Sequence, residues 1–579
     1  MFFSFSFSFF WNIISKKRKT CLNPLPNDFC RILDKNKKRE YSMLDLLIKN
    51  ATIVDGTGSA PYIGNVGVKD GKLVTAPAKD AKAVRTVDAA GLVLAPGFID
   101  AHCHEDETLG NKASMLSKVS QGITTVSCGN CGESYFPVSK DPEKLALIRQ
   151  SKKEYLSAPD CANKDVFDTF TSFENYLAYA EKRPTAYDYT MLTGHGTLRV
   201  AAMGLANRQA TEQELSLMKD LLRESMEHGS RGLSSGLIYT PSCYADEREL
   251  TELCKVVADY DGYYAVHLRN EAGLLEESVA EAIRTAENAG CRLNLSHHKA
   301  CGRENWGKTE KTLKMIREAQ ERGLFVYTDV YPYLATGNYI NICLPKEFFE
   351  NGQEKMAQLL REPSVRKEMK EYILSWQEGR YCNCGGFDNI LICNAPAMPD
   401  AVNKTIGEYA RELGRDEFEV YFDLCCENGG AGHAAYFAMS EDDLVRILLD
   451  DNAVIGTDSY DIGESNAVHP RSFGTFPLLL SEYVREKKIM PLEKMVRKMT
   501  GATADFMGLD GKGYIRDGYD ADLVLFDPNT VAARADFRNS RELSDGIIEV
   551  FTAGQSVYRD KKLTGNCPGR FIPWKMQKL

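Results

Sequence analysis

The sequence predicts an α/β protein, a TIM-like (β/α)8 barrel flanked by a small β-sandwich domain that both chain ends build together. Between residues 97 and 502, short apolar strands alternate with helical segments, as in parallel barrels. The patterns before and after this stretch are those of short strands separated by turns. Eight candidate barrel strands end in polar residues, at His102 and His104, Cys131, His195, Tyr239, His267, His297, Tyr331 and Asp458. Barrel chemistry takes place at such strand ends.

Turn residues and pattern changes set the predicted domain bounds. Residues 43–96 hold strand-like runs divided by Asp-Gly turns, and residues 503–579 return to the same pattern. We assign both ranges to the β-sandwich domain and 97–502 to the catalytic barrel. Residues 338–394 hold a charged helical segment and no barrel strand. They are predicted to be an insertion over the barrel mouth that acts as a lid.

Two helices between the barrel strands are predicted most clearly. The ranges are 211–228 and 274–289, and each carries acidic residues in its first turn. Acidic side chains are favourable there because they face the positive end of the helix dipole.

The first 42 residues differ from the rest of the chain. An aromatic and serine run, FFSFSFSFFW, precedes the basic cluster Lys16–Lys19. A secretory signal has the reverse order, with its positive charge before the apolar stretch. We interpret 1–42 as an atypical leader outside the fold, with Met43 as the translation start. A membrane anchor is the alternative, although the apolar stretch is shorter than the roughly 20 residues of a membrane span.

Composition narrows the class of protein. The 579 residues are 43% hydrophobic and 26% charged, which is typical of a globular protein, and the net charge of −10 disfavours nucleic acid and anionic membranes as partners. The 17 cysteines follow no disulfide-scaffold spacing, so a reducing, cytoplasmic location is expected. The partner expected instead is a small molecule.

The strand ends carry a candidate metal site. His102 and His104 share one face of a strand because alternate residues point the same way. Six of the nine histidines lie at or beside strand ends. Imidazole and thiolate ligands suit zinc, and a carboxylate can complete an open site. The candidate ligands are His102, His104, Cys131, His267, His297 and Asp458.

Several of these residues allow a second interpretation. His267 could be a hydrogen-bonded core histidine. Alternation sends only one of His297 and His298 into the barrel, and we choose His297 because it shares a face with apolar strand residues. Cys131 lies in a C-x-x-C with Cys128, a spacing also typical of redox pairs and zinc knuckles. The sequence around Asp458 could be a simple turn. At the last of eight strands, Asp458 can instead accept a proton from water and pass it to a leaving amine.

Longer motifs add a family resemblance. GFIDAHCHED, GNCG, GLSSGLIY, AVHLRNE, SHHKACGRENWGK, HPRSFGTFP and GYIRDGYDADLVLFDP occur in this order between residues 45 and 572. Together they resemble the D-aminoacylase (N-acyl-D-amino-acid deacylase) branch of the amidohydrolase superfamily. The resemblance implies a metal-dependent barrel and hydrolysis of N-acyl-D-amino acids to a carboxylate and a free D-amino acid.

The resemblance also implies roles for single residues. It implies one tight Zn²⁺ on Cys131, His267 and His297, with His102 and His104 at a second, weaker metal position. Asp458 corresponds to the catalytic acid and base of the branch. A cysteine takes the place that a bridging lysine has in most two-metal members of the superfamily.

Substrate-binding residues are expected beside this site. Lys299 and Arg471 are candidates to bind the α-carboxylate, although Arg471 could equally form a structural salt bridge. Tyr239 and Tyr331 match tyrosines on the pocket side of the branch. The sequence departs from the branch pattern at Glu105, Gly196 and near Gly337. The change near Gly337 bears on which amino-acid side chain of the substrate is preferred.

Two other functions compete with this prediction. A cyclic amidase of the hydantoinase or dihydroorotase type usually needs the bridging lysine, and no lysine ends the fourth strand, GLSSGLIY. A non-catalytic scaffold that keeps the barrel would typically lose metal ligands, whereas all six candidates are present.

Overall fold

A computed structural model describes residues 43–152, 156, 164–350, 352–429, 432–459 and 468–575. The predicted leader, residues 1–42, and the question of its role lie outside the described residues. No helix in the described part is long and apolar enough to cross a membrane.

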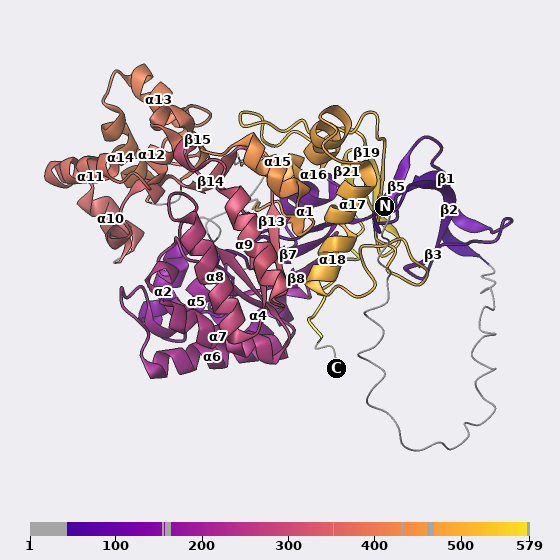
Figure 1. Cartoon of the computed structure of the whole chain (residues 1–579), viewed down its shortest axis with the longest axis horizontal. Coiled ribbons are helices and arrows are strands. Elements are labelled where there is room, and N and C mark those ends of the chain that lie inside the picture. Colours follow the sequence, from indigo (N-terminus) through magenta and orange to yellow (C-terminus); the bar gives the residue numbers. More distant parts are fainter. Residues whose placement is uncertain are drawn as a thin grey trace, which may run out of the picture. The chain divides into compact units, whose positions relative to one another are not determined.

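Within the described residues, eight parallel strands form the barrel. Figure 1 labels three of them, β7, β8 and β13. The third strand is interrupted at Leu192 and is therefore divided into β8 and β9. Backbone hydrogen bonds from Ala101 to Ile455 (3.0 Å) and from Asp458 to His102 (2.7 Å) join the last strand to the first and close the barrel. The strands are β6 (Phe98–Asp100), β7 (Ile123–Cys128), β8 (Asp188–Met191) with β9 (Thr193–Gly194), β10 (Gly232–Gly236), β11 (Tyr263–His267), β12 (Arg292–Leu295), β13 (Val326–Val330) and β17 (Ala453–Ile455). The predicted (β/α)8 barrel is confirmed.

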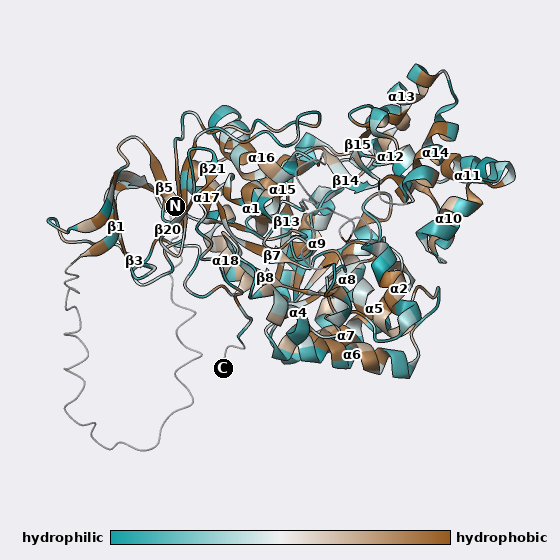
Figure 2. Ribbon diagram, turned by 180° about the vertical axis from the view of Figure 1, so that it is seen from behind, coloured by the Kyte–Doolittle hydropathy of each residue, from teal (hydrophilic) through white to brown (hydrophobic). Residues whose placement is uncertain are grey.

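Amphipathic helices cover the barrel. Figure 2 shows hydrophobic and hydrophilic stretches alternating along α6 and α7, and residues such as Leu215, Met218 and Leu222 of α6 are buried. The two clearest predicted helices are confirmed, and Thr211 caps α6 through a capping box with Glu214. These helices are α1 (Lys112–Val119), α2 (Pro142–Ser151), α4 (Phe173–Ala180), α5 (His195–Met203), α6 (Glu212–Glu227), α7 (Glu247–Asp259), α8 (Leu275–Ala289), α9 (Thr309–Glu321), α15 (Glu441–Leu449), α16 (Arg471–Leu478), α17 (Leu492–Met499) and α18 (Gly501–Met507).

Both chain ends share one nine-stranded sheet with its own hydrophobic core. The two ends meet where β5 pairs antiparallel with β18, and β1 pairs with β2, β4 and β5. The C-terminal segment then returns to the barrel, because Tyr189 of β8 bridges to Phe571. The strands are β1 (Leu44–Ile53), β2 (Tyr62–Lys69), β3 (Lys72–Val74), β4 (Ala83–Asp88), β5 (Val93–Pro96), β18 (Leu523–Phe526), β19 (Ile547–Thr552), β20 (Gln555–Arg559) and β21 (Lys562–Leu563).

A separate module with its own core lies between β13 and α15 (Figure 1). It is longer than the predicted insertion, 338–394, because β16 (His433–Phe437) pairs with both β14 (Ala335–Tyr339) and β15 (Ile390–Asn394). The charged helical segment predicted within 338–394 forms two helices, since Pro363 begins a new one. The helices of this inserted module are α10 (Gln353–Leu359), α11 (Pro363–Ser375), α12 (Arg380–Cys384), α13 (Ile406–Leu413) and α14 (Glu417–Asn428).

Candidate metal centre

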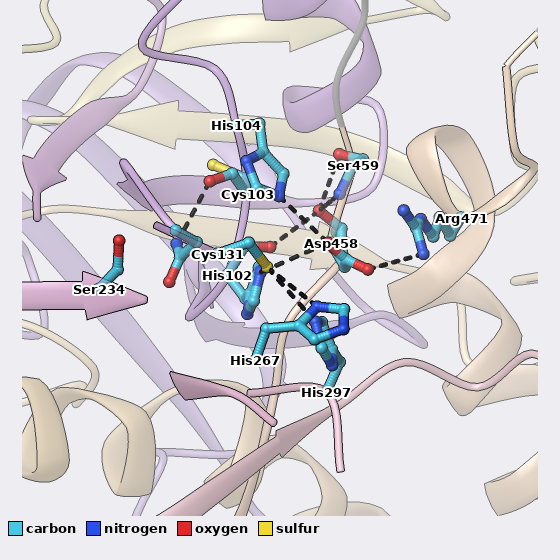
Figure 3. A network of polar contacts seen from close by, with 12 residues as sticks. His102, Cys103, His104, Cys131, Ser234, His267, His297, Asp458, Ser459 and Arg471 are labelled. Atoms are coloured by element: carbon cyan, nitrogen blue, oxygen red, sulfur yellow. Dashed lines mark hydrogen bonds and ion pairs between the residues drawn. The ribbon is translucent and has the colours of Figure 1, made fainter. Parts of the chain in front are cut away.

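Five strand ends bring the candidate ligands together. Figure 3 shows the side chains of His102, Cys131, His267, His297 and Asp458 pointing toward one another. His102 follows β6, Cys131 follows β7, and His267 is the last residue of β11. His297 and Asp458 each lie within three residues of the ends of β12 and β17.

The Cys131 sulfur is at the centre of this group. Its Sγ lies 3.3 Å from His102 Nε2, 3.4 Å from His297 Nε2 and 3.7 Å from His267 Nδ1. Asp458 Oδ1 lies 3.4 Å from His102 Nε2 and 3.2 Å from His104 Nε2. His104 therefore joins the group through Asp458.

The donor set fits a metal ion. One ligand atom each from His102, Cys131, His297 and Asp458 lie within 4.8 Å of one another. Ligands about 2.0–2.3 Å from a tetrahedral zinc ion stand about 3.3–3.8 Å apart, which is the spacing around the Cys131 sulfur. His267, Glu271 and His297 form an overlapping group. The thiolate and imidazole donors suit zinc.

The backbone is strained at three of these residues. Cys131, His297 and Asp458 have φ values of 52°, 36° and 49°, in the left-handed region that side chains larger than glycine seldom occupy. Such strain costs about 1–3 kcal/mol per residue and collects at functional sites.

The two cysteines of the C-x-x-C have opposite environments. Burial would raise the pKa of Cys131, but His102 and His297 outweigh it and hold that pKa well below the usual value. Burial and the neighbouring Cys103, whose sulfur is 3.6 Å away, raise the pKa of Cys128. Only Cys131 is therefore suited to bind as a thiolate.

A buried carboxylate that the sequence did not single out orients two ligands. Asp329 of β13 is completely buried, and its carboxylate lies 3.2 Å from His102 Nδ1. The same carboxylate accepts a hydrogen bond from the His297 backbone N–H at 2.8 Å and from Asn294 Nδ2 at 2.7 Å. An acid bonded to His102 Nδ1 leaves Nε2 free for a metal.

Glu271 plays a similar part behind the other two histidines. Its carboxylate is 3.3 Å from His297 Nδ1 and 3.7 Å from His267 Nε2. Lys299 and Arg380, an inserted-module residue, balance its charge at 2.5 and 2.8 Å. Lys299 Nζ is also 2.7 Å from His297 Nδ1, so this predicted carboxylate anchor lies directly behind a metal ligand.

A second buried network fixes the loop that carries Asp458. Lys118 of α1 donates hydrogen bonds to Asp100 at 2.9 Å, Thr457 at 3.1 Å and Ser459 at 2.6 Å. Asp100 also accepts from the Thr457 backbone N–H at 2.8 Å. Asp458 is thus held from both sides where the last strand meets the first.

Arg471 is paired with Asp458 in this structure. Its Nη1 is 2.7 Å from Asp458 Oδ2, which is the salt bridge that the sequence left open as an alternative. Burial would raise the pKa of Asp458, but Arg471 and the neighbouring histidines hold it well below its usual value. Asp458 is therefore a carboxylate, the form that accepts a proton.

The two predicted tyrosines lie in the same small cavity as Asp458 and Arg471. Asn338 donates a 3.0 Å hydrogen bond to the Tyr239 hydroxyl, and burial raises the pKa of Tyr239 well above its usual value. Arg471 stacks over the Tyr331 ring with its guanidinium carbon 4.9 Å from the centroid. Tyr239 is therefore a protonated hydroxyl facing the site.

The structure separates the two remaining strand-end histidines from this site. His195 bonds to Glu249 at 2.8 Å and to Ser242 at 3.0 Å. His298 points away from His297 and bonds to Thr312 at 2.7 Å. The site residues that sequence reasoning missed, Asp329 and Glu271, had one usable signal. Both are acidic residues within apolar or histidine-bearing strand motifs, where an unpaired charge would be costly.

The chain is similar to known proteins over most of its length. The amidohydrolase family model matches residues 85–358 and 392–558. The chain is 33% identical to the D-aminoacylase of Alcaligenes xylosoxydans xylosoxydans, over 91% of this chain and 97% of that protein. It is 34% identical to the N-acyl-D-aspartate deacylase of the same organism, over 92% and 97%.

A solved structure is similar over the same length. The N-acyl-D-glutamate deacylase of Bordetella bronchiseptica, complexed with zinc and a phosphonate inhibitor, has a TM-score of 0.76 and 30% identity. The alignment covers 92% of this chain and 100% of that one. This chain therefore belongs to the D-aminoacylase branch of the amidohydrolase family.

Proposed function

We propose that this protein is a zinc-dependent hydrolase of N-acyl-D-amino acids, which it cleaves to a carboxylate and a free D-amino acid. The observation that carries this proposal is the convergence of four buried residues, Cys131, His102, His297 and Asp458, whose ligand atoms lie within 4.8 Å of one another. The named relatives with similar sequences along nearly their whole length are deacylases of such substrates.

We assign the tight metal position to Cys131, His267 and His297, with His102 and His104 beside it. A bound zinc ion would polarise the scissile carbonyl and lower the pKa of water. Asp329 and Glu271 hold the histidine rings so that the nitrogens facing Cys131 remain available. The zinc complex of the Bordetella relative and the thiolate ligand both favour zinc.

Asp458 is proposed as the acid and base. Its carboxylate accepts a proton from the attacking water and returns it to the departing amine. His104 Nε2, 3.2 Å away, orients the carboxylate from one side and Arg471, 2.7 Å away, from the other. The Tyr239 hydroxyl is placed to donate to the oxyanion that forms when water adds to the amide.

Lys299 and Arg471 remain the proposed anchors for the substrate α-carboxylate. Both face the small cavity that holds Asp458, and each is buried against a carboxylate of the protein. A substrate carboxylate would share these cations with Glu271 and Asp458. Tyr331, whose ring packs against Arg471, forms the wall beside them.

The test is amine release from matched N-acetyl-D- and N-acetyl-L-amino acids across a panel of side chains, using zinc-loaded protein. We expect turnover of the D series only. Turnover of neither series, with zinc still bound, would refute the proposal and direct the search to cyclic amides.

A further inference from the structure

A second, larger cavity of about 500 Å³ lies beside the metal centre. This volume is within the roughly 300–1,000 Å³ of small-molecule sites. The barrel and the inserted module both contribute to its wall. Most of the wall is apolar. Its large apolar residues include Leu147, Ile148, Val200, Leu205, Leu237, Ile238, Ile342, Leu344, Phe349, Tyr372 and Trp376.

This apolar cavity adjoins the metal centre. The small cavity with Asp458 has a volume of about 70 Å³, and the two share Cys131, Tyr239, Glu271 and Arg380 in their walls. A molecule bound at Cys131 can therefore extend into the apolar cavity.

Five of the eight charged residues in the apolar wall form ion pairs within the protein, and Lys346, Glu347 and Glu378 line the wall as well. Arg380 lies 2.8 Å from Glu271, and Arg269 lies 2.7 Å from Glu281. Lys152 lies 3.1 Å from Glu133. The wall carries four cations and four carboxylates, so its charges balance, and most of its surface is apolar; the cavity therefore favours an uncharged, apolar occupant over a carboxylate side chain.

The position of Asp458 decides which part of the substrate enters. Asp458 returns its proton to the amine, so the amine and its α-carbon must lie on the Asp458 side of the scissile carbonyl. Asp458, Lys299 and Arg471 line the small cavity and are absent from the wall of the apolar one. The substituent on the other side of the carbonyl, which is the acyl chain, then points toward Tyr239 and the apolar cavity.

We propose that the apolar cavity binds the acyl chain, and that this protein prefers N-acyl-D-amino acids with long straight acyl chains over N-acetyl substrates. This inference rests on the proposed function and adds the class of acyl group. It also gives the inserted module a role, because Ile342, Leu344, Phe349, Tyr372 and Trp376 are module residues.

The test is a chain-length series from acetyl through butanoyl and hexanoyl to octanoyl. The amino acid is held at whichever D-amino acid is hydrolysed fastest as its N-acetyl derivative. Burial of a methylene is worth about 0.8 kcal/mol, so kcat/KM should rise roughly fourfold per methylene until the cavity is filled. Turnover of the acetyl substrate with a flat or falling series would overturn the inference and leave the proposed function standing.

Two tryptophan variants test whether the acyl chain binds in the apolar cavity. Ile342→Trp narrows the apolar cavity away from the metal ligands, so the octanoyl-to-acetyl ratio of kcat/KM should fall toward one while acetyl turnover persists. Leu374→Trp is the matched control. Leu374 is 47% exposed on α11 and is not in the cavity wall, so its ratio should match that of the unaltered protein. An unchanged octanoyl-to-acetyl ratio in Ile342→Trp would show that the acyl chain binds elsewhere and would overturn the inference.

A binding measurement tests the apolar cavity without turnover. The Kd values of acetate and octanoate, which model the carboxylate products, are measured calorimetrically with zinc-loaded protein. Octanoate should bind far more tightly, and Ile342→Trp should remove the difference. Equal Kd values would overturn the inference. If no N-acyl-D-amino acid is hydrolysed, the proposed function fails and the inference about acyl substrates fails with it, whatever the Kd values.

Discussion

The buried strand-end histidine His195 has different surroundings from the histidines of the metal centre. His195 begins α5, and both of its ring nitrogens bond to protein side chains, Ser242 and Glu249. Arg199 in turn binds the Glu249 carboxylate at 2.6 Å. In the metal centre, His102 and His297 each have a carboxylate within 3.3 Å of Nδ1 and present Nε2 to the Cys131 sulfur, and Lys299 Nζ also lies 2.7 Å from His297 Nδ1.

The difference shows how a ligand histidine is told from a structural one. Burial is the same in both groups, since His102, His195 and His297 are all 2% exposed or less. What differs is the partner of the ring nitrogen that is not bonded to a carboxylate: the Cys131 sulfur for His102 and His297, and the Ser242 hydroxyl for His195. Where that partner is another potential ligand, the histidine is prepared for a metal. Where it is a hydroxyl or carboxylate outside the cluster, the histidine supports the fold.

The largest effect on turnover is expected from Asp458→Asn. The amide cannot carry a proton between water and amine, so kcat should fall about 10²–10⁴-fold, while zinc content stays at the level of the unaltered protein. Steady-state kinetics and elemental analysis measure the two quantities. Near-normal kcat in this variant would remove Asp458 from the mechanism.

Cys131→Ser should break the metal centre itself. Serine lacks the thiolate, so we expect zinc affinity to fall by more than the roughly 10–100-fold typical of changes to outer residues. Cys128→Ser is the control, because Cys128 is buried next to Cys103 and faces away from the ligands. Zinc affinity is measured by competition with a chelator. Equal affinities in the two variants would contradict the assignment of Cys131.

Asp329→Asn tests the orienting carboxylate. The variant keeps the size of the side chain but weakens its hold on His102 Nδ1, so zinc affinity or kcat/KM should fall about 10–100-fold. The same competition assay applies. If the variant has full affinity and full activity, Asp329 has only a structural role.

Glu249→Gln should affect stability and leave the zinc content unchanged. Burial would raise the pKa of Glu249, but His195 and Arg199 lower it to about 2, against an ordinary value of 4.5. A lowered carboxylate pKa stabilises the folded state above pH 4.5, by roughly 3 kcal/mol, and this contribution disappears as the pH falls toward 2. The difference in denaturant midpoint between the unaltered protein and the variant should therefore shrink from pH 7 to pH 3. Loss of zinc from Glu249→Gln at pH 7 would show that His195 and Glu249 support the metal centre, which would contradict this comparison.

Local patterns made the barrel strands and the ligand types predictable. A strand that ends in His-x-His, or in Asp458 after an apolar run, carries its signal within a few residues. The length of the inserted module was not predictable, because β16 pairs with strands that lie far away in sequence. The pairing of Lys299 with Glu271 and of Arg471 with Asp458 is also non-local. Sequence alone could therefore name these cations but could not give their partners.

The most direct test of the metal centre is the zinc K-edge X-ray absorption spectrum of the zinc-loaded protein. We predict one sulfur at about 2.3 Å, from Cys131, together with nitrogen and oxygen ligands at about 2.0–2.2 Å. A spectrum without sulfur, or one with two or more sulfur ligands, would contradict a tight site built from Cys131, His267 and His297.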